Sequence, residues 1–195
     1  MVLADERGIE SLSMRKLAQE LGFEVMSLYN HVSNKDEILA GIVDLVAHEI
    51  EPPSSDVEWK AAMRQSADSA HQVLLRHPWA ARLWWTSTPG TARLAYLESL
   101  LRRLREAGFS KELTYHAYHA LTMHIVGFTI QQLSLKFDQE DIGELVAKFL
   151  GEIAMDEFPN FVEHAMQHVE GSVHDNEFEF VLNLILDGLD RARSY

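Results

Sequence analysis

Apolar residues recur at helical spacing along almost the whole chain, and the alternation that marks a β-strand is nearly absent. Before a double proline at positions 52 and 53, the pattern predicts helices over residues 2–7, 13–21, 25–31 and 34–50. After it, we expect helices over residues 57–76, 79–86, 90–107, 111–136, 142–155, 159–169 and 176–193. The sequence therefore predicts an all-α protein with a small N-terminal head, residues 1–50, and a larger helical body, residues 55–195.

The ends of two helices in the head carry recognisable capping residues. Ser13 suits the N-cap of the helix over 13–21, and Gly22 suits the left-handed position that follows it. Two overlapping pairs with capping-box spacing lie within residues 33–37, so either Ser33 or Asn34 begins the box.

Residues 13–32 have the layout of a helix-turn-helix. The apolar positions that we expect to pack its two helices together are Leu17, Ala18, Leu21, Leu28 and Val32. Six side chains are then left to project from the second helix and its end: Val25, Met26, Ser27, Tyr29, Asn30 and His31. An Asn can hydrogen-bond to adenine, Val and Met can contact a thymine methyl, and Tyr, Ser and His more often reach phosphates. Lys35, at the start of the next helix, could hold a phosphate.

The net charge argues against DNA binding by the chain as a whole. Lys and Arg number 17 against 30 Asp and Glu, which gives a formal charge of −13. Non-specific DNA binding depends on neutralising phosphates with basic side chains. Any DNA binding must therefore come from the local motif.

Composition excludes several other classes of protein. The chain has no cysteine, which excludes disulfide scaffolds, zinc-thiolate fingers and iron–sulfur clusters. No apolar run approaches the roughly 18–20 residues that a membrane span needs, and acidic residues follow the first four positions. We therefore expect a cytoplasmic protein with no membrane segment.

Several runs of residues resemble the tetracycline-repressor (TetR) family. In the head, residues 8–22, the run Ser27-Leu28-Tyr29-Asn30-His31-Val32 and the pair Asn34-Lys35 carry the resemblance to the family's DNA-binding domain. In the body, residues 77–89, 97–98, 107–110 and 186–189 resemble, in the expected order, the C-terminal domain of the tetracycline repressor's own subfamily. The resemblance implies a transcriptional regulator rather than an enzyme. It implies a ligand-responsive repressor that binds near-palindromic double-stranded operator DNA as a homodimer and is released by a small-molecule effector.

The resemblance also implies which residues face the DNA: Arg15, Val25, Met26, Ser27, Tyr29, Asn30, His31 and Lys35. The residue type itself agrees with the family at Tyr29, His31 and Lys35. Val25, Met26 and Asn30 match the variable positions that set the operator sequence.

Two body helices are apolar nearly all round, over residues 113–130 and 178–189. Such a helix must be covered on every side, either by the protein's own core or by a second subunit. The second of them is the last helix of the chain and has no later element to cover it, so we favour a dimer. The family resemblance implies a four-helix bundle between subunits, with Val181, Ile185 and Leu189 in the interface.

Aromatic residues of the body are candidates for an effector pocket, in particular Trp84, Trp85, His124 and Phe128. Two adjacent tryptophans on a helix point about 100° apart, so they cannot both face one core. The resemblance puts Trp84 where tetracycline-binding members carry a magnesium-ligating histidine, and Leu100 and Ser66 where they use amides, with only His48 retained. The expected effector is thus a mostly apolar small molecule, bound with no metal and no cofactor.

Histidine pairs leave an alternative function open. His164 and His168 are four residues apart, and His116 and His119 are three apart, spacings that could chelate a metal. The sequences Glu-x-x-His and His-Glu-x-x-His are absent, so di-iron bundles and zincin hydrolases lack their signature. A helical metal-binding protein or metalloenzyme that uses these pairs remains the alternative.

Overall fold

The structure is a computed structural model that describes residues 1–134, 146, 148, 151, 155–170 and 177–194. Every regular element within these residues is helical, as the sequence predicts. In none of the described helices is there a stretch both long and apolar enough to cross a membrane. The helix expected over 142–155 lies almost entirely outside the described residues.

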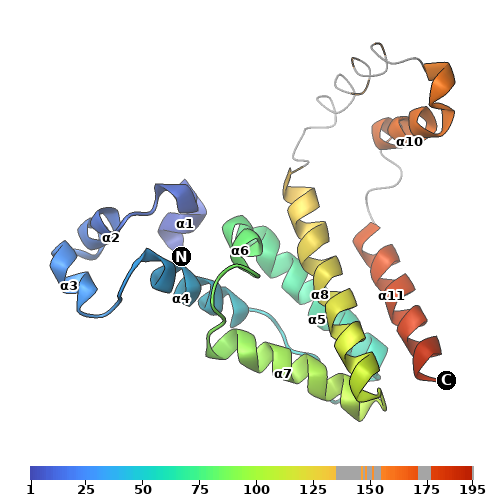
Figure 1. Cartoon of the computed structure of the whole chain (residues 1–195), viewed down its shortest axis with the longest axis horizontal. Helices are drawn as coiled ribbons and strands as arrows, with labels where there is room; N and C mark the ends of the chain where they lie inside the picture. The colour runs from blue at the N-terminus through green and yellow to red at the C-terminus, as the bar shows by residue number, and fades with distance from the viewer. Residues whose placement is uncertain (135–145, 147, 149–150, 152–154, 171–176, 195) are drawn as a thin grey trace.

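The head is formed by α1 (Val2–Arg7), α2 (Met14–Leu21), α3 (Val25–Tyr29) and the start of α4 (Lys35–Ala47), as Figure 1 shows. The predicted ends of α2 are confirmed, because the Ser13 hydroxyl accepts a hydrogen bond from the Lys16 N–H at 3.2 Å and Gly22 has φ 71°. The expected burial of Leu21 is wrong: its side chain is 58% exposed, whereas Ala18 is 1% exposed. Leu21 lies in the last turn of α2, where the chain reverses and leaves its side chain uncovered.

The helix α4 belongs to both the head and the body. Its N-terminus settles the capping question, because Asn34 Oδ1 accepts from the Glu37 N–H at 2.9 Å. Glu37 in turn accepts from the Ser33 N–H at 2.7 Å. Further along the helix, Val43 and Val46 are fully buried in the core of the body. The helix α4 therefore connects the head to the core of the body.

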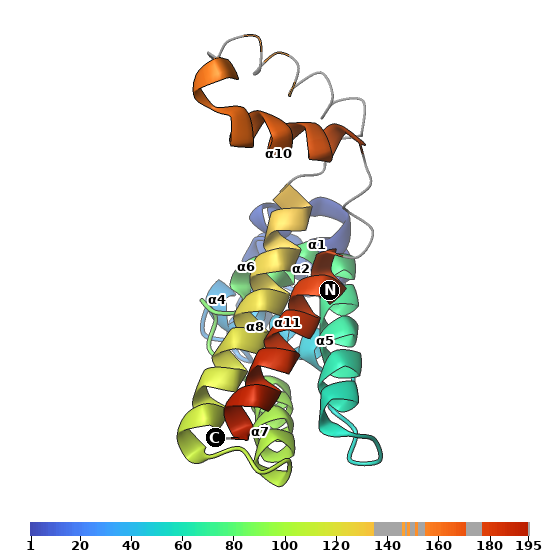
Figure 2. The same cartoon turned by 90° about the vertical axis from the view of Figure 1, so that its right-hand side faces the viewer.

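Six further helices make up the described part of the body: α5 (Trp59–Arg76), α6 (Pro78–Leu83), α7 (Thr91–Glu106), α8 (Lys111–Ser134), α10 (Pro159–Glu170) and α11 (Glu177–Arg193). The helix α8 packs against α5, α6, α7 and α11 and forms the centre of the bundle (Figure 2). Buried side chains that fill the core include Met63, Leu74, Leu104, Phe109, Leu182 and Leu186.

One carboxylate joins α4 to α7. Asp44, on α4, accepts hydrogen bonds from the backbone N–H groups of Ala92 and Arg93, each at 2.9 Å. These are N–H groups of the first turn of α7, which have no partner within their own helix. Gly90, the N-cap residue of α7, has no side chain to supply the cap, so Asp44 caps the helix from outside. Burial raises the pKa of the Asp44 carboxyl, but the hydrogen bonds from Arg93 and Ala92 outweigh it and leave this pKa below its usual value.

The Arg93 side chain extends the same junction to the connection between α6 and α7. Arg93 is 6% exposed, and its guanidinium donates to the carbonyls of Trp84, Ser87 and Thr88. The Arg93 Nε lies 3.5 Å from Asp44 Oδ1. We call the contacts of Asp44 and Arg93 the α4–α7 clamp.

We expect Gly90→Ala to destabilise the protein, because a Cβ atom at this position would lie 2.5 Å from Asp44 Oδ2. The carboxylate would have to move and give up its hydrogen bonds to α7, at a cost of about 1–3 kcal/mol. In a chain of this size that loss lowers the Tm by roughly 3–10 °C, which thermal unfolding followed by circular dichroism measures.

Gly41→Ala is the matched control for this prediction. Gly41 also lies on the clamp side of the molecule, within α4, but a Cβ there meets nothing within 4 Å. The substitution should leave the Tm unchanged or raise it, since Ala is the better helix former. In a variant that already carries Asp44→Ala, Gly90→Ala should lower the Tm only slightly. An equal loss with and without Asp44 would contradict the proposed clash.

Candidate functional site

The helix α3 and the residues that follow it form an exposed surface at the end of the head far from the body (Figure 1). Met26 is 72% exposed and Tyr29 is 46% exposed. Asn30 and His31 are exposed too, but they lie just beyond the helix, which ends at Tyr29. Val25, Ser27, Leu28 and Val32 are half-buried. The predicted DNA-facing residues on and after α3 are thus all exposed or half-buried at this end of the head.

The basic residues of the head differ in their surroundings. Arg15 is exposed on α2. Lys35 is half-buried, and its ammonium donates to the Ile9 carbonyl at 3.4 Å. Arg7 lies 3.5 Å from Glu20 in an exposed ion pair. Two of the four Lys and Arg side chains of the head are therefore already engaged within the protein.

Sequence reasoning missed Phe23, which is 63% exposed in the turn between α2 and α3. Together with Leu21, at 58%, it extends the apolar surface beside α3. Phe23 directly follows the left-handed Gly22, where an apolar residue commonly packs back on the preceding helix, so the sequence carried no signal for its exposure.

A second set of polar contacts ties α1 to the body. Asp5 Oδ1 accepts from the Trp79 indole N–H at 2.6 Å and lies 2.8 Å from His77 Nδ1. His77 Nε2 lies 3.2 Å from Glu49, just after α4, and Glu49 also accepts from Arg76 at 3.0 Å. The Arg76 hydrogen bond and the nearby His77 hold the pKa of Glu49 below its usual value against the effect of burial. The head is therefore attached to the body through α1 as well as through α4.

Within the body, four rings from three helices form an aromatic cluster: His71 of α5, His124 and Phe128 of α8, and Phe178 of α11. The Phe178 ring stacks on His71, with centroids 4.2 Å apart, and on His124, at 4.7 Å. The Phe128 ring meets the Phe178 ring edge-on, with centroids 5.4 Å apart, and the centroids of both imidazoles lie 5.7 Å from that of Phe128. Two of the predicted ligand-binding residues, His124 and Phe128, are thus brought together.

Hydrogen bonds fix both imidazoles of the cluster. His71 Nδ1 lies 2.8 Å from the Thr129 hydroxyl. His124 Nε2 lies 2.9 Å from the Phe178 carbonyl, and because a carbonyl only accepts, this nitrogen carries the proton. Burial lowers the pKa of both histidines, and for His71 the nearby His124 adds to the effect. Both rings are therefore neutral at pH 7.

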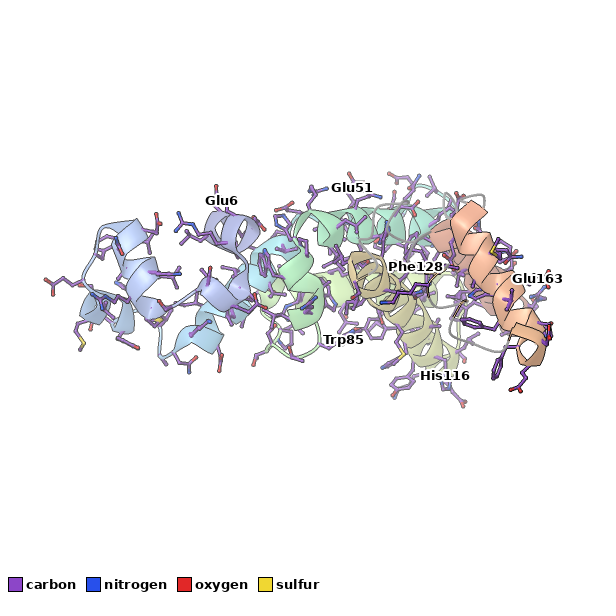
Figure 3. All side chains as sticks on the ribbon, turned by 90° about the horizontal axis from the view of Figure 1, so that it is seen from above. Glu6, Glu51, Trp85, His116, Phe128 and Glu163 are labelled. Carbon is purple, nitrogen blue, oxygen red and sulfur yellow. The ribbon has the colours of Figure 1, made fainter. Side chains whose placement is uncertain are left out.

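The other two predicted ligand-binding residues lie elsewhere. Trp84 and Trp85 follow α6, and Figure 3 shows Trp85 well separated from Phe128. Trp84 packs half-buried against the core, while Trp85 is 50% exposed, which confirms that the two do not share one core. The structure thus divides the predicted ligand-binding residues between two regions.

A groove of about 940 Å³ lies near the tryptophans, between α4 and the connection from α6 to α7. Its lining includes Asp44, Leu45, His48 and Thr88. His48, which the family resemblance retains, therefore lies next to the α4–α7 clamp rather than in the aromatic cluster.

The histidine pairs do not form a metal centre in the part of the chain that the structure describes. His119 Nδ1 lies 2.8 Å from the Tyr115 carbonyl, and its ring lies 4.3 Å from the Tyr115 ring. Among the described residues, no group of three or more potential metal ligands comes together. The side chain of His168, the partner predicted for His164, lies outside the described residues.

Comparison with known protein families decides the class of the protein. The family described as bacterial regulatory proteins, tetR family, matches residues 1–42. The family described as tetracyclin repressor-like, C-terminal domain, matches residues 51–193. The chain belongs to the TetR family. It is therefore a DNA-binding transcriptional repressor and not an enzyme, and residues 25–29 form the second helix of its helix-turn-helix.

Relatives along the whole length agree with this assignment. The TetR family chain is 28% identical to the tetracycline repressor protein class C of Escherichia coli over 98% of its own length and 87% of the relative's. It is 32% identical to the HTH-type transcriptional repressor DrrR1 of Streptomyces coeruleorubidus, over 75% of its length and 56% of the relative's. The crystal structure of the Streptomyces coelicolor TetR family protein ActR in complex with actinorhodin matches with a TM-score of 0.86 and 29% identity. That match covers 100% of this chain and 94% of ActR.

The two cluster histidines should make the stability of this TetR family protein depend on pH. Their folded pKa values lie below the ordinary 6.5, so the unfolded chain binds more protons as the pH falls through about 6.5. The contribution of the two neutral histidines to the free energy of unfolding is fully present above that pH. It is lost below it, by up to about 1.4 kcal/mol per pH unit for each extra proton that the unfolded chain binds.

Chemical denaturation at a series of pH values between 5 and 8 measures this dependence. The His71→Phe variant keeps a ring in the cluster but cannot titrate, so its stability should fall less steeply with acid than that of the wild type. His31→Gln removes an exposed histidine and is the control. If the free energy of unfolding falls equally steeply with acid in His71→Phe and in the wild type, the lowered pKa of His71 does not contribute to the pH dependence.

Proposed function

We propose that the protein is a homodimeric, ligand-responsive repressor that binds a near-palindromic operator and is released by a mostly apolar small molecule. The observation that carries this proposal is the position of α4, which starts beside the DNA-facing surface and ends buried in the body. A ligand that favours one arrangement of the body helices then favours one position of the head.

On the operator, α3 enters the major groove and the two heads of the dimer occupy successive grooves, about 34–36 Å apart. Met26 and Asn30 read base edges, and Tyr29, His31 and Lys35 contact phosphates, in agreement with their exposure or position on the head. The head contributes few cations, so phosphate neutralisation supplies less of the affinity and base contacts and the fit of the dimer to the operator supply more of it.

The second subunit covers an apolar strip that the single chain leaves exposed on α8 and α11. Met123 on α8 is 65% exposed, and Phe180 and Leu184 on α11 are 63% and 55% exposed. Val181 and Ile185 are half-buried beside this strip. Leu189, by contrast, is 9% exposed and packs into the core of its own chain, so the predicted interface is centred about one residue earlier on the helix.

The proposed effector is not a magnesium chelate of tetracycline. At the positions where tetracycline-binding relatives carry drug-contacting amides, Leu100 is 4% exposed and Ser66 is 1% exposed. The Ser66 hydroxyl donates to the Glu51 carbonyl at 2.8 Å and lies 3.1 Å from the Tyr96 hydroxyl. Both positions are occupied by the protein's own core packing. The complex of ActR with actinorhodin supports an effector site in the body of the present protein as well.

Selection of operator DNA from a random pool tests the proposal. On the selected site, the low basic content of the head predicts a shallow salt dependence, with a slope of log K against log salt on the order of −3 to −6 for the dimer. Asn30→Ala should relax the preference at one base pair by about 1–3 kcal/mol.

Tyr29→Phe and Lys35→Ala serve as the matched comparison. Because they remove phosphate contacts, they should weaken every site about equally. Failure to select any sequence would overturn the proposed DNA binding. A loss of sequence preference in Lys35→Ala equal to that in Asn30→Ala would refute the division between base and phosphate contacts.

Leu184→Arg tests the dimer. Its side chain is exposed in the single chain, so Arg should leave the fold intact but place an unpaired charge in the proposed interface, where burial costs several kcal/mol. Analytical ultracentrifugation should find a folded monomer. Leu189→Arg introduces the charge into the chain's own core and should instead lower the helical content. A wild type that is monomeric at micromolar concentration would contradict the dimer.

A further inference from the structure

Phe178 uses both its ring and its backbone in the aromatic cluster. Its ring stacks on two imidazoles at once, with interplanar angles of 11° to His71 and 18° to His124. Its carbonyl oxygen accepts the hydrogen bond from His124 Nε2 at 2.9 Å. A flat ring and a carbonyl oxygen from one residue thus satisfy two different parts of the same site.

We propose that Phe178 occupies the effector site when no effector is bound. The effector is then an aromatic carbonyl compound whose ring and carbonyl oxygen replace those of Phe178. This inference rests on the proposed function and specifies its ligand. The aromatic slot is the surface that His71, His124 and Phe128 present to Phe178.

The aromatic slot is prepared for such a ligand. The Thr129 hydroxyl holds the His71 ring in place, and Phe128 closes the slot edge-on. Because burial lowers the pKa of both histidines, the rings are neutral and stack without the cost of burying a charge. The His124 donor would lose its partner when Phe178 leaves, so a ligand with a carbonyl oxygen is preferred to one without it.

Phe178 is also placed where it can leave. It is the second residue of α11, in the first turn, whose backbone N–H groups have no acceptor within the helix. Its side chain is only half-buried. Displacing it requires rearrangement of one helical turn, while Leu182 and Leu186 keep the rest of α11 in the core.

The first turn of α11 links the aromatic slot to the proposed dimer interface and so to the DNA-binding heads. Phe180, two residues further along α11, belongs to the exposed strip that we assign to the dimer interface. A ligand in the aromatic slot therefore alters the packing of α11 against the second subunit, and with it the separation of the two heads.

Isothermal titration calorimetry with anthraquinone-2-sulfonate as the probe tests the proposal on the full chain. Phe178→Ala removes the competing ring, so the probe should bind at least about tenfold more tightly than to the wild type, since its apparent affinity is no longer reduced by self-occupation. Phe128→Ala removes one side of the slot and should weaken binding. Phe158→Ala, at a residue that is 51% exposed outside the cluster, is the matched control and should change nothing.

Two further measurements separate a specific slot from the filling of any cavity. Anthracene-2-sulfonate has the same ring system without carbonyl groups and should bind about three- to tenfold less tightly than the anthraquinone. That preference should disappear in His124→Phe, which keeps a ring but loses the donor. In the wild type, the anthraquinone should also speed amide hydrogen exchange in residues 177–181.

The results that would overturn the proposal are equally specific. One is that Phe178→Ala binds the anthraquinone no more tightly than the wild type does. Another is that Phe128→Ala gains as much affinity as Phe178→Ala, and the third is that the preference for a carbonyl compound survives in His124→Phe. Because calorimetry uses no DNA, these outcomes are independent of the operator experiment. Tight binding in the slot that leaves the affinity of the wild type for its selected operator unchanged would overturn the role as effector site, whereas failure to bind any operator would refute the proposed function itself.

Discussion

The carboxylate of Asp44 is the contact that fixes α4, which leads to the head, against α7 of the body. It caps α7 from a different helix, and the adjacent Arg93 ties the same junction to the connection between α6 and α7. A carboxylate at a helix N-terminus gains from both the hydrogen bonds and the helix dipole. Gly90 permits this close approach, because a side chain there would occupy the space of the carboxylate.

Together with the Asp5–His77–Glu49 contacts, the clamp gives the head two separate attachments to the body. One passes through α1 and the other through α4, and both end near α6. Hydrogen-bonded contacts of this kind break or form as units, so they favour discrete positions of the head over a continuous range. The aromatic cluster lies in another part of the body, and the core of α5, α8 and α11 connects it with both attachments.

The sequence predicts this fold well where local chemistry decides and poorly where the decision lies between helices. Ser13, Gly22 and Asn34 act on residues within four positions of themselves, and the structure confirms the helix ends that they mark. Leu21 has the right spacing for burial, but its exposure depends on what lies beyond the turn. Asp44 looks like an ordinary acid on a helix surface, since nothing in the sequence relates it to the backbone of Ala92, 48 positions away.

The candidate ligand site shows the same division. His124 and Phe128 share a face of α8 because they are four residues apart, and the sequence could identify them as a pair. His71 and Phe178 come from α5 and α11, so only the packing of three helices brings them to the same place. Trp84 and Trp85 were attractive because of their ring type, but neither has a ring contact with the aromatic cluster.

The brevity of α3 affects the thermodynamics of DNA recognition. It has five residues, its N-cap residue Glu24 makes no side-chain cap, and none of its residues is fully buried. A helix of this length is unstable by itself in water and is held in place by its contacts with the rest of the head. Its fluctuations are reduced when it enters the major groove, so binding includes a loss of conformational entropy. Association with the operator should therefore combine a favourable enthalpy with an opposing entropy and a negative heat-capacity change, the signature of coupled ordering and binding.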